Sequence, residues 1–369
     1  MKKLMVNLAF CIFAGLVFVE CQNSDQKIFE HEYIYKLTNY DTKQSARAVV
    51  MVHLRSTLFN DVFDYLQVAK NPTISGICSC DEETLKAVTA VAVRRDLVFE
   101  KWDSVERNYR IAVQVTATRS EAIEGIADIL RDSDFTAECV KVWQRVHNAR
   151  TNIGKLRDDL YRHNNQDADL QEGYHKQAIQ ILLGDFLTRG LNAYQDDIYD
   201  LAIQCFKRAI LLDSSLLQSH EYLCDVYAKQ RNYVKLLACC QTCISLDSTS
   251  VKAYQMMGDA YMKLAKYQEA LYYYEKIKSL DSSNLFVYVN IGKAYAMQRK
   301  YQQAINSVQV TLSQRPQEEN ALVAMGEIYA TQGNRKIASH YYQDAANLGN
   351  AKAKKWLKPF SHGGRGGGR

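Results

Sequence analysis

A pattern of residues that recurs every 34 positions constrains the fold of this chain more than any other feature of its sequence. One slot of the pattern holds Gly258, Gly292 and Gly326, with Cys224 one period earlier. Tyrosine follows this slot by three residues, and a small or aliphatic residue follows it by twelve: Tyr227, Tyr261, Tyr295, Tyr329, Leu236, Ala270, Ala304 and Ala338. A fixed period of this length indicates a solenoid of helical hairpins, because no single hairpin can bury its apolar face alone.

The residues at these slots resemble the tetratricopeptide repeat (TPR), most clearly in the period that contains Gly258, Tyr261, Ala270 and Tyr274. The resemblance implies two helices per period, which cross closely at the small residue. Upstream, Gly184 is the expected crossing residue of a further hairpin. It lies 18 residues before Ala202, where Gly258 lies 12 before Ala270, so six inserted residues are expected around 192–197. We therefore predict five TPR-like repeats over residues 177–350, the first of them irregular.

The TPR resemblance also implies a binding surface, because the first helix of each repeat lines the concave face in that family. The matching positions here form an expected protein-binding groove: Glu221, Asp225, Lys229, Gln255, Asp259, Lys263, Val289, Lys293, Met297, Val323, Glu327 and Thr331. Glu221 and Asp225 would repel a carboxylate. Mixed charge beside apolar groups such as Phe286 favours an extended or helical protein segment as the ligand. The alternative, that a neighbouring segment of the same chain fills the groove, stays open.

Residues 28–130 differ in kind from the repeats. Alternating apolar residues over 29–37 predict a strand, helical spacing over 59–66 predicts a helix, and Ser79 with Glu82 predicts a capping box that opens a second helix. Segments 97–102 and 109–115 flank a polar turn, and apolar residues alternate over 109–115, which predicts a hairpin. The order strand, helix, helix, hairpin describes a small α+β domain in front of a mainly α chain.

This order, together with Lys101-Trp102-Asp103 and Tyr109-Arg110, resembles an N-terminal module of bacterial envelope proteins similar to the N-terminal domain of the flagellar assembly protein T. The resemblance implies a periplasmic or cell-surface scaffold. Between this module and the repeats, residues 137–175 are expected to form a linking amphipathic helix, because apolar residues from 139 to 160 step mostly by three or four. The apolar stripe of this helix could pack on a neighbouring domain or support dimerisation.

Residues 1–21 are expected to be a signal peptide. Lys2 and Lys3 precede an apolar run that extends to Val19, which is short for a membrane span. Cleavage after Cys21 would release a chain exported to the periplasm or cell envelope, and acylation of Cys21 would instead tether the chain to a membrane. An uncleaved anchor or a buried first helix is the alternative.

Charge and composition indicate an ordinary helix-rich protein whose body is not a nucleic-acid surface. The net charge is +5, but residues 350–369 hold six Lys and Arg and no acid, which leaves the rest of the chain near −1. We expect residues 351–369 to form a capping helix followed by a flexible Gly/Arg tail. That tail resembles a fragment of an arginine–glycine RNA-binding segment, so an intracellular TPR adaptor that contacts RNA is the alternative function.

No sequence motif for catalysis is found. Cys239, Cys240 and Cys243 include a Cys-x-x-Cys, but the period places Cys240 and Cys243 at packing slots, where cysteine behaves as a small hydrophobe. A redox or metal role for these cysteines is the open alternative. We therefore predict a non-enzymatic scaffold that binds protein, with no cofactor, no metal and no small-molecule substrate.

Overall fold

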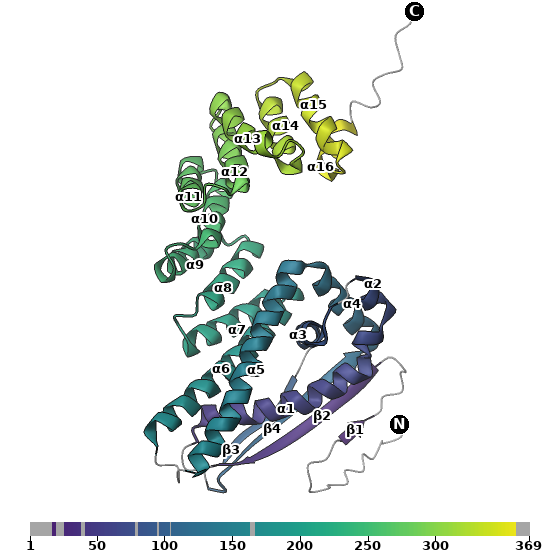
Figure 1. Cartoon of the computed structure of the whole chain (residues 1–369), viewed down its shortest axis with the longest axis vertical. Coiled ribbons are helices and arrows are strands. Elements are labelled where there is room, and N and C mark those ends of the chain that lie inside the picture. Colours follow the sequence, from purple (N-terminus) through teal and green to yellow (C-terminus); the bar gives the residue numbers. More distant parts are fainter. Residues whose placement is uncertain are drawn as a thin grey trace, which may run out of the picture. The chain divides into compact units, whose positions relative to one another are not determined.

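A four-stranded antiparallel sheet and the helices around it form the first part of the chain. The computed structural model describes residues 17–19, 26–37, 41–77, 80–93, 96–103, 105–162 and 167–358 (Figure 1). Residues 1–219 and 220–369 are two separate units. Residues 1–16 and 20–21 of the expected signal peptide, Cys21 among them, and the Gly/Arg tail lie outside the described residues. None of the described helices is long and apolar enough to cross a bilayer.

The sheet has the order β1-β2-β4-β3. Its strands are β1 (Val17–Val19), β2 (Gln26–Lys36), β3 (Asp96–Asp103) and β4 (Asn108–Thr118). β2 pairs with β4 over its whole length, from Gln26 opposite Thr118 to Lys36 opposite Asn108. The alternating residues that predicted the first strand and the hairpin place Phe29, Tyr109 and Ile111 in the core. The predicted α+β character of this region is therefore confirmed.

Helices of the first unit cover this sheet and extend beyond it. They are α1 (Lys43–Leu66), the 3-10 turn η1 (Val68–Lys70), α2 (Pro72–Ile77), α3 (Glu82–Ala92), α4 (Arg119–Arg131), α5 (Ser133–Arg162), α6 (Ala168–Gln195) and α7 (Tyr199–Leu212). α1 packs along β2 and β4 (Figure 1). The N-cap of α3 is Asp81, whose carboxylate accepts a hydrogen bond from the Thr84 amide at 2.7 Å. The expected cap, Ser79, lies outside the described residues.

The long helix α5 belongs to the same unit as the sheet. Its predicted apolar stripe is buried, including Cys139, Val146 and Leu160, and it packs against α6 and α3. α5 and α6 approach closely where Gly184 faces Val146, because a Cβ at Gly184 would overlap the Val146 side chain. Because this stripe is covered within the unit, it is not free for dimerisation.

Stacked helical hairpins form the second unit, as the 34-residue period predicted. The helices are α8 (Leu217–Lys229), which spans the unit boundary, α9 (Tyr233–Leu246), α10 (Val251–Lys263), α11 (Tyr267–Leu280), α12 (Leu285–Met297), α13 (Tyr301–Gln314), α14 (Glu319–Thr331), α15 (Arg335–Asn347) and α16 (Ala351–Leu357). From α9 to α16 each helix packs on the next, and α12 also packs on α14 (Figure 1). The fold is a mainly α, TPR-like solenoid with a small N-terminal α+β region.

The turn between the two helices of each hairpin repeats with the same period. It contains one residue in the left-handed region: Asp197, Arg231, Ala265, Arg299 or Gly333. The amide of the following residue then donates to a carbonyl five positions earlier. Examples are Ile198 to Ala193 at 2.8 Å and Lys266 to Tyr261 at 2.9 Å. The α6–α7 hairpin thus ends its first helix as the later hairpins do.

This shared turn corrects the prediction of an irregular first repeat. The crossing residue of the α6–α7 hairpin is Gly190, 34 positions before Cys224, and a Cβ at Gly190 would overlap the ring of Phe206. Gly190 lies 12 residues before Ala202, the regular spacing, so no residues are inserted around 192–197. Gly184, the expected crossing residue, instead faces α5 through Val146.

Substitutions in these turns should change stability through the backbone alone. Gly333 has φ +90°, and a Cβ there would meet nothing within 4 Å, whereas Ala265 has φ 58°. We expect Gly333→Ala to lower the free energy of unfolding of the repeat unit by about 1 kcal/mol, because L-residues disfavour this region. Ala265→Gly should raise it by about 0.5 kcal/mol.

Urea unfolding of the full chain measures both changes. Gly76→Ala serves as a control, since Gly76 lies within a helix with open space around it. A Gly333→Ala chain as stable as the wild type would contradict this account.

Candidate functional site

Twelve residues that the TPR resemblance assigned to a groove lie on one side of four helices in the second unit. α8, α10, α12 and α14 contribute three residues each, spaced by four positions, so each trio lies along one face of its helix. The three members of each trio differ in exposure and contacts, so the twelve residues form three rows across the helices. The first row is Glu221, Gln255, Val289 and Val323, the second is Asp225, Asp259, Lys293 and Glu327, and the third is Lys229, Lys263, Met297 and Thr331.

The first row is only partly accessible. Val289 is 1% exposed and Val323 is 5% exposed, and both belong to one hydrophobic cluster that extends from α12 to α16. These two residues therefore pack the solenoid and cannot directly contact a ligand in this structure, contrary to the expectation from sequence. Their polar counterparts Glu221 and Gln255 are partly exposed.

The second row joins neighbouring helices through its acidic groups. Asp225 pairs with Lys252 of α10 at 2.9 Å, and Glu327 pairs with Lys352 of α16. The Tyr274 hydroxyl of α11 donates to Asp259 at 2.6 Å. Burial, reinforced by the Asp259 carboxylate, raises the pKa of Tyr274, which keeps this donor protonated. These acidic side chains thus connect neighbouring helices and stabilise the solenoid.

The third row is open to solvent. Lys229, Lys263 and Thr331 are exposed, and Met297 is 52% exposed. α12 also presents Phe286, at 51% exposure, which lies 11 positions before Met297 and therefore on a similar side of the helix. Lys293, partly exposed, lies between them in sequence. α12 thus offers two large apolar side chains where the neighbouring first helices offer charged and polar ones.

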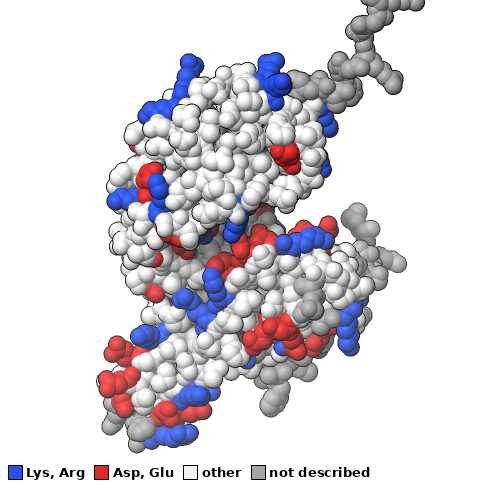
Figure 2. Space-filling view, turned by 45° about the horizontal axis from the view of Figure 1, so that its top comes forward, with Lys and Arg blue, Asp and Glu red and all other residues white. Residues whose placement is uncertain are grey.

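Charged residues are dispersed on one face of the repeat unit. On the face shown in Figure 2, its basic and acidic residues are scattered among wide areas of uncharged residues. A surface of this kind suits a protein ligand better than a phosphate backbone, which requires clustered Lys and Arg.

An open pocket on α11 and α13 was not anticipated from the sequence. It is lined by Gln268, Leu271, Tyr272, Glu275, Lys276, Ser279, Tyr295, Lys300 and Gln303. Tyr272 is 58% exposed, and the Lys276 ammonium lies 5.5 Å from the centre of its ring. Most of these residues come from the second helix of a hairpin, whereas the TPR resemblance pointed only to first helices. The sequence shows a tyrosine at position 272 but not its exposure, which depends on how the helices pack.

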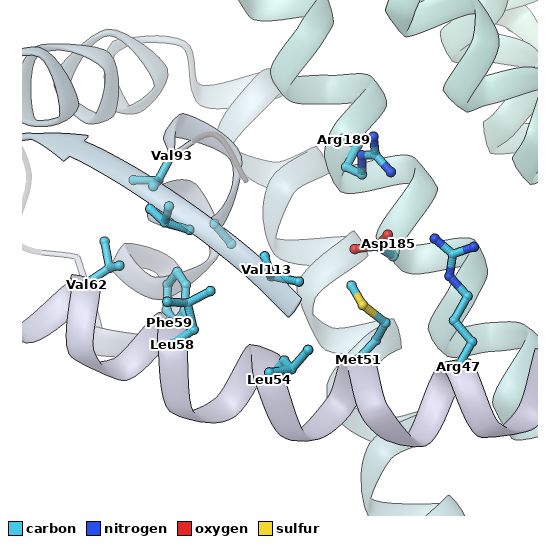
Figure 3. Close-up of a pocket in the computed structure, with 12 residues that line it drawn as sticks. Arg47, Met51, Leu54, Leu58, Phe59, Val62, Val93, Val113, Asp185 and Arg189 are labelled. Carbon is cyan, nitrogen blue, oxygen red and sulfur yellow. The ribbon is translucent and has the colours of Figure 1, made fainter. Parts of the chain in front are cut away.

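The first unit holds a small cavity between α1, α3, β4 and α6. Its volume is about 40 Å³, and a neighbouring cavity of about 200 Å³ shares Met51, Phe59 and Asp185 with it. Figure 3 shows Arg47, Asp185 and Arg189 at one end and apolar side chains at the other. The lining of the smaller cavity includes neither a hydroxyl nor a thiol nucleophile. Sequence reasoning missed this cavity because four separate elements build it.

Four cysteines meet inside the α8–α9 hairpin. Cys240 and Cys243 are buried, as their packing slots predicted, and Cys239 and Cys224 of α8 are buried beside them. The Cys224 and Cys243 sulfurs are 3.8 Å apart, and the Cys239 thiol donates to the His220 carbonyl at 3.3 Å. Contact with the other thiols raises the pKa of Cys224, and thiol donors from Cys224 and Cys239 lower that of Cys243. In the sequence Cys224 lies apart from the other three, at the crossing slot of its period.

The fold and the repeated crossing geometry define the second unit as an α-solenoid of TPR-like hairpins. Residues 251–284, which contain α10 and α11, match the family model for the tetratricopeptide repeat. No curated protein matches this chain.

Several solved structures show a weak likeness to this chain. A crystal structure of MamA is 20% identical, covers 48% of this chain and 95% of its own, and has a TM-score of 0.40. YrrB, described as a TPR protein with an unusual peptide-binding site, is 16% identical over 55% of this chain and 97% of its own, with a TM-score of 0.39. TTC0263, a TPR protein of Thermus thermophilus, is 17% identical over 48% and 97%, with a TM-score of 0.41. At these TM-scores the likeness carries no conclusion about function.

Proposed function

We propose that this chain is a non-enzymatic scaffold that binds a protein segment on the face formed by α8, α10, α12 and α14. The observation that carries the proposal is the exposed apolar pair Phe286 and Met297 on α12. Large apolar side chains surrounded by polar residues are a common feature of interface centres. The TPR match over residues 251–284 supports the proposal, because it includes one of the four helices.

The chemistry of this face defines the kind of partner. Asp225 and Glu327 are already paired with lysines of neighbouring helices, so a ligand gains little from those acids. Phe286 and Met297 favour an apolar side chain in the partner, and Lys263 and Lys293 favour a nearby acidic group. An extended or helical segment that combines the two fits this face.

Alanine substitutions test this surface. The double variant Phe286→Ala/Met297→Ala should bind its partner at least about tenfold more weakly, because each buried side chain of this size contributes about 1.5–3 kcal/mol. A photoreactive residue at position 297, used in native cells, would identify the partner. The affinity of the purified pair is then measured by calorimetry.

A matched control lies on the other set of helices. Val234 is 80% exposed and Leu246 is 40% exposed, both on α9, so Val234→Ala/Leu246→Ala should leave the affinity unchanged. Equal weakening by both double variants would argue against the α12 face. A crosslink from position 297 to the chain itself would show that its own segment fills the groove.

We further propose that the scaffold is exported and acts in a bacterial envelope assembly. The support is the sequence of residues 1–21 and the resemblance of residues 28–130 to an envelope module. An intact mass of the protein from fractionated native cells tests this directly. An exported chain beginning at Gln22, or one with a lipid at Cys21, would support export. An unprocessed cytoplasmic chain would favour the RNA-contacting adaptor, whose binding should require residues 361–369.

A further inference from the structure

The α8–α9 hairpin departs from the packing that the other repeats use. At the crossing, the others place a glycine against a larger side chain: Gly190 with Phe206, Gly258 with Tyr274, Gly292 with Val308 and Gly326 with Tyr342. The corresponding pair in the α8–α9 hairpin is Cys224 and Cys240. The repeat fold therefore requires no thiol at either slot.

Two further cysteines replace residues that pack well elsewhere. Cys239 occupies the slot of Tyr273 and Tyr341, whose rings stack on Tyr261 and Tyr329 at 5.5 and 5.7 Å. Cys243 occupies the slot held by Ile277 in the next repeat. Three of the four slots hold other residues in every other hairpin, and the slot of Cys239 holds cysteine elsewhere only at Cys205 of α7. All four thiols of the α8–α9 hairpin are at most 8% exposed.

Their sulfur atoms are arranged like those of a metal site. The Cys224, Cys239 and Cys243 sulfurs lie within 4.8 Å of one another, with 3.8 Å between Cys224 and Cys243. Tetrahedral thiolate coordination with Zn–S bonds of about 2.3 Å places the sulfurs about 3.8 Å apart. A disulfide needs about 2.05 Å. The Cys224 thiol also interacts with that of Cys240, which does not belong to this group of three sulfurs.

We propose that Cys224, Cys239 and Cys243 bind one thiophilic d10 metal ion, with Zn²⁺ as its representative. The three cysteines supply three thiolate ligands. Each thiol that coordinates releases its proton to solvent, so the ion replaces protons inside the hairpin. Cys239 and Cys243 are four residues apart on α9, while Cys224 comes from α8. The ion therefore cross-links α8 and α9, the two helices of one hairpin.

Cobalt substitution tests the site in the full chain. Protein purified metal-free under reducing, oxygen-free conditions is titrated with Co²⁺. We expect thiolate-to-cobalt charge-transfer absorption in the near ultraviolet and the intense visible bands of a tetrahedral site, saturating at one ion per chain. Added Zn²⁺ should then bleach this spectrum, because thiolates prefer Zn²⁺ over Co²⁺.

Variants built from the other repeats separate binding from folding. Cys243→Ile installs the residue of the next repeat and should abolish the cobalt spectrum. Cys224→Gly/Cys240→Tyr installs the packing of Gly258 on Tyr274 and should do the same. Cys205→Ala, which removes a free buried thiol of α7, should leave the spectrum intact. Circular dichroism verifies that each variant is folded.

Three outcomes would overturn the proposal. One is a folded, reduced wild-type chain that shows no cobalt–thiolate absorption. A second is a Cys243→Ile chain that is folded and binds cobalt as the wild type does. The third is protein from native cells in which peptide mapping finds a Cys224–Cys243 disulfide in place of metal.

Discussion

Replacing Gly258 by valine is expected to lower the free energy of unfolding of the repeat unit by about 3 kcal/mol, through overpacking. A Cβ at this position would lie 2.7 Å from Cδ1 and 2.9 Å from Cζ of the Tyr274 ring. The ring cannot readily move aside, because it is 2% exposed and its hydroxyl is bonded to Asp259. The added side chain must therefore separate α10 from α11.

Urea unfolding of the full chain, with hydrogen exchange to localise the loss, measures this effect. Gly154→Ala is the control, since a Cβ at Gly154 of α5 meets nothing within 4 Å and alanine is the better helix former. It should stabilise the first unit by up to about 1 kcal/mol. In the double variant Gly258→Val/Tyr274→Ala, the free energy of unfolding should fall by less than the sum of the decreases for the two single variants, because the clash is then removed. Additive losses would show that Tyr274 does not cause the effect.

Asp41→Ala is expected to destabilise the first unit by about 2–3 kcal/mol, because the change leaves buried donors without their acceptor. The Asp41 carboxylate accepts hydrogen bonds from Tyr35 at 3.0 Å, from Tyr174 at 3.1 Å and from Ser45 at 3.2 Å. Tyr174 of α6 is fully buried, and burial together with Asp41 raises its pKa. Its hydroxyl therefore remains a donor that must be satisfied.

Comparison with Tyr174→Phe gives this prediction a second measurement. Tyr174→Phe removes the donor together with the hydrogen bond, so this variant should lower the free energy of unfolding by only about 1 kcal/mol. In an Asp41→Ala/Tyr174→Phe chain the two losses should not add. Asp64→Ala, at an exposed position of α1, should be nearly neutral. If Asp64→Ala and Asp41→Ala were equally destabilising, the tether between residue 41 and α6 would not explain the loss.

The solenoid could be predicted because its signal is local and repeated. Gly258, Tyr261 and Ala270 recur at fixed intervals in later hairpins, and the structure places equivalent residues at equivalent crossings. The first hairpin is predicted wrongly for the same reason. Ala193 stands where later hairpins have tyrosine, so the pattern around Gly190 is weak and Gly184 is expected as the crossing residue instead.

The candidate sites were harder to predict because they depend on which neighbour covers each side chain. Met297 and Val289 belong to the same helix and to the same expected groove, yet one is half exposed and the other is buried against α14. Asp41 and Tyr174 are 133 positions apart, and no local spacing indicates their contact. Cys224 and Cys243 are 19 positions apart, and only the hairpin brings them together.

The five left-handed turn residues have a consequence for the size of the array. Positions 197, 231, 265, 299 and 333 adopt the same local conformation, so the turns that contain them are equivalent. A segment that runs from one of these turns to the next can be duplicated or deleted, and the crossing residues still face their partners. A stretch of any other length would turn the following helices out of register. The array can thus change its reach only in whole hairpins.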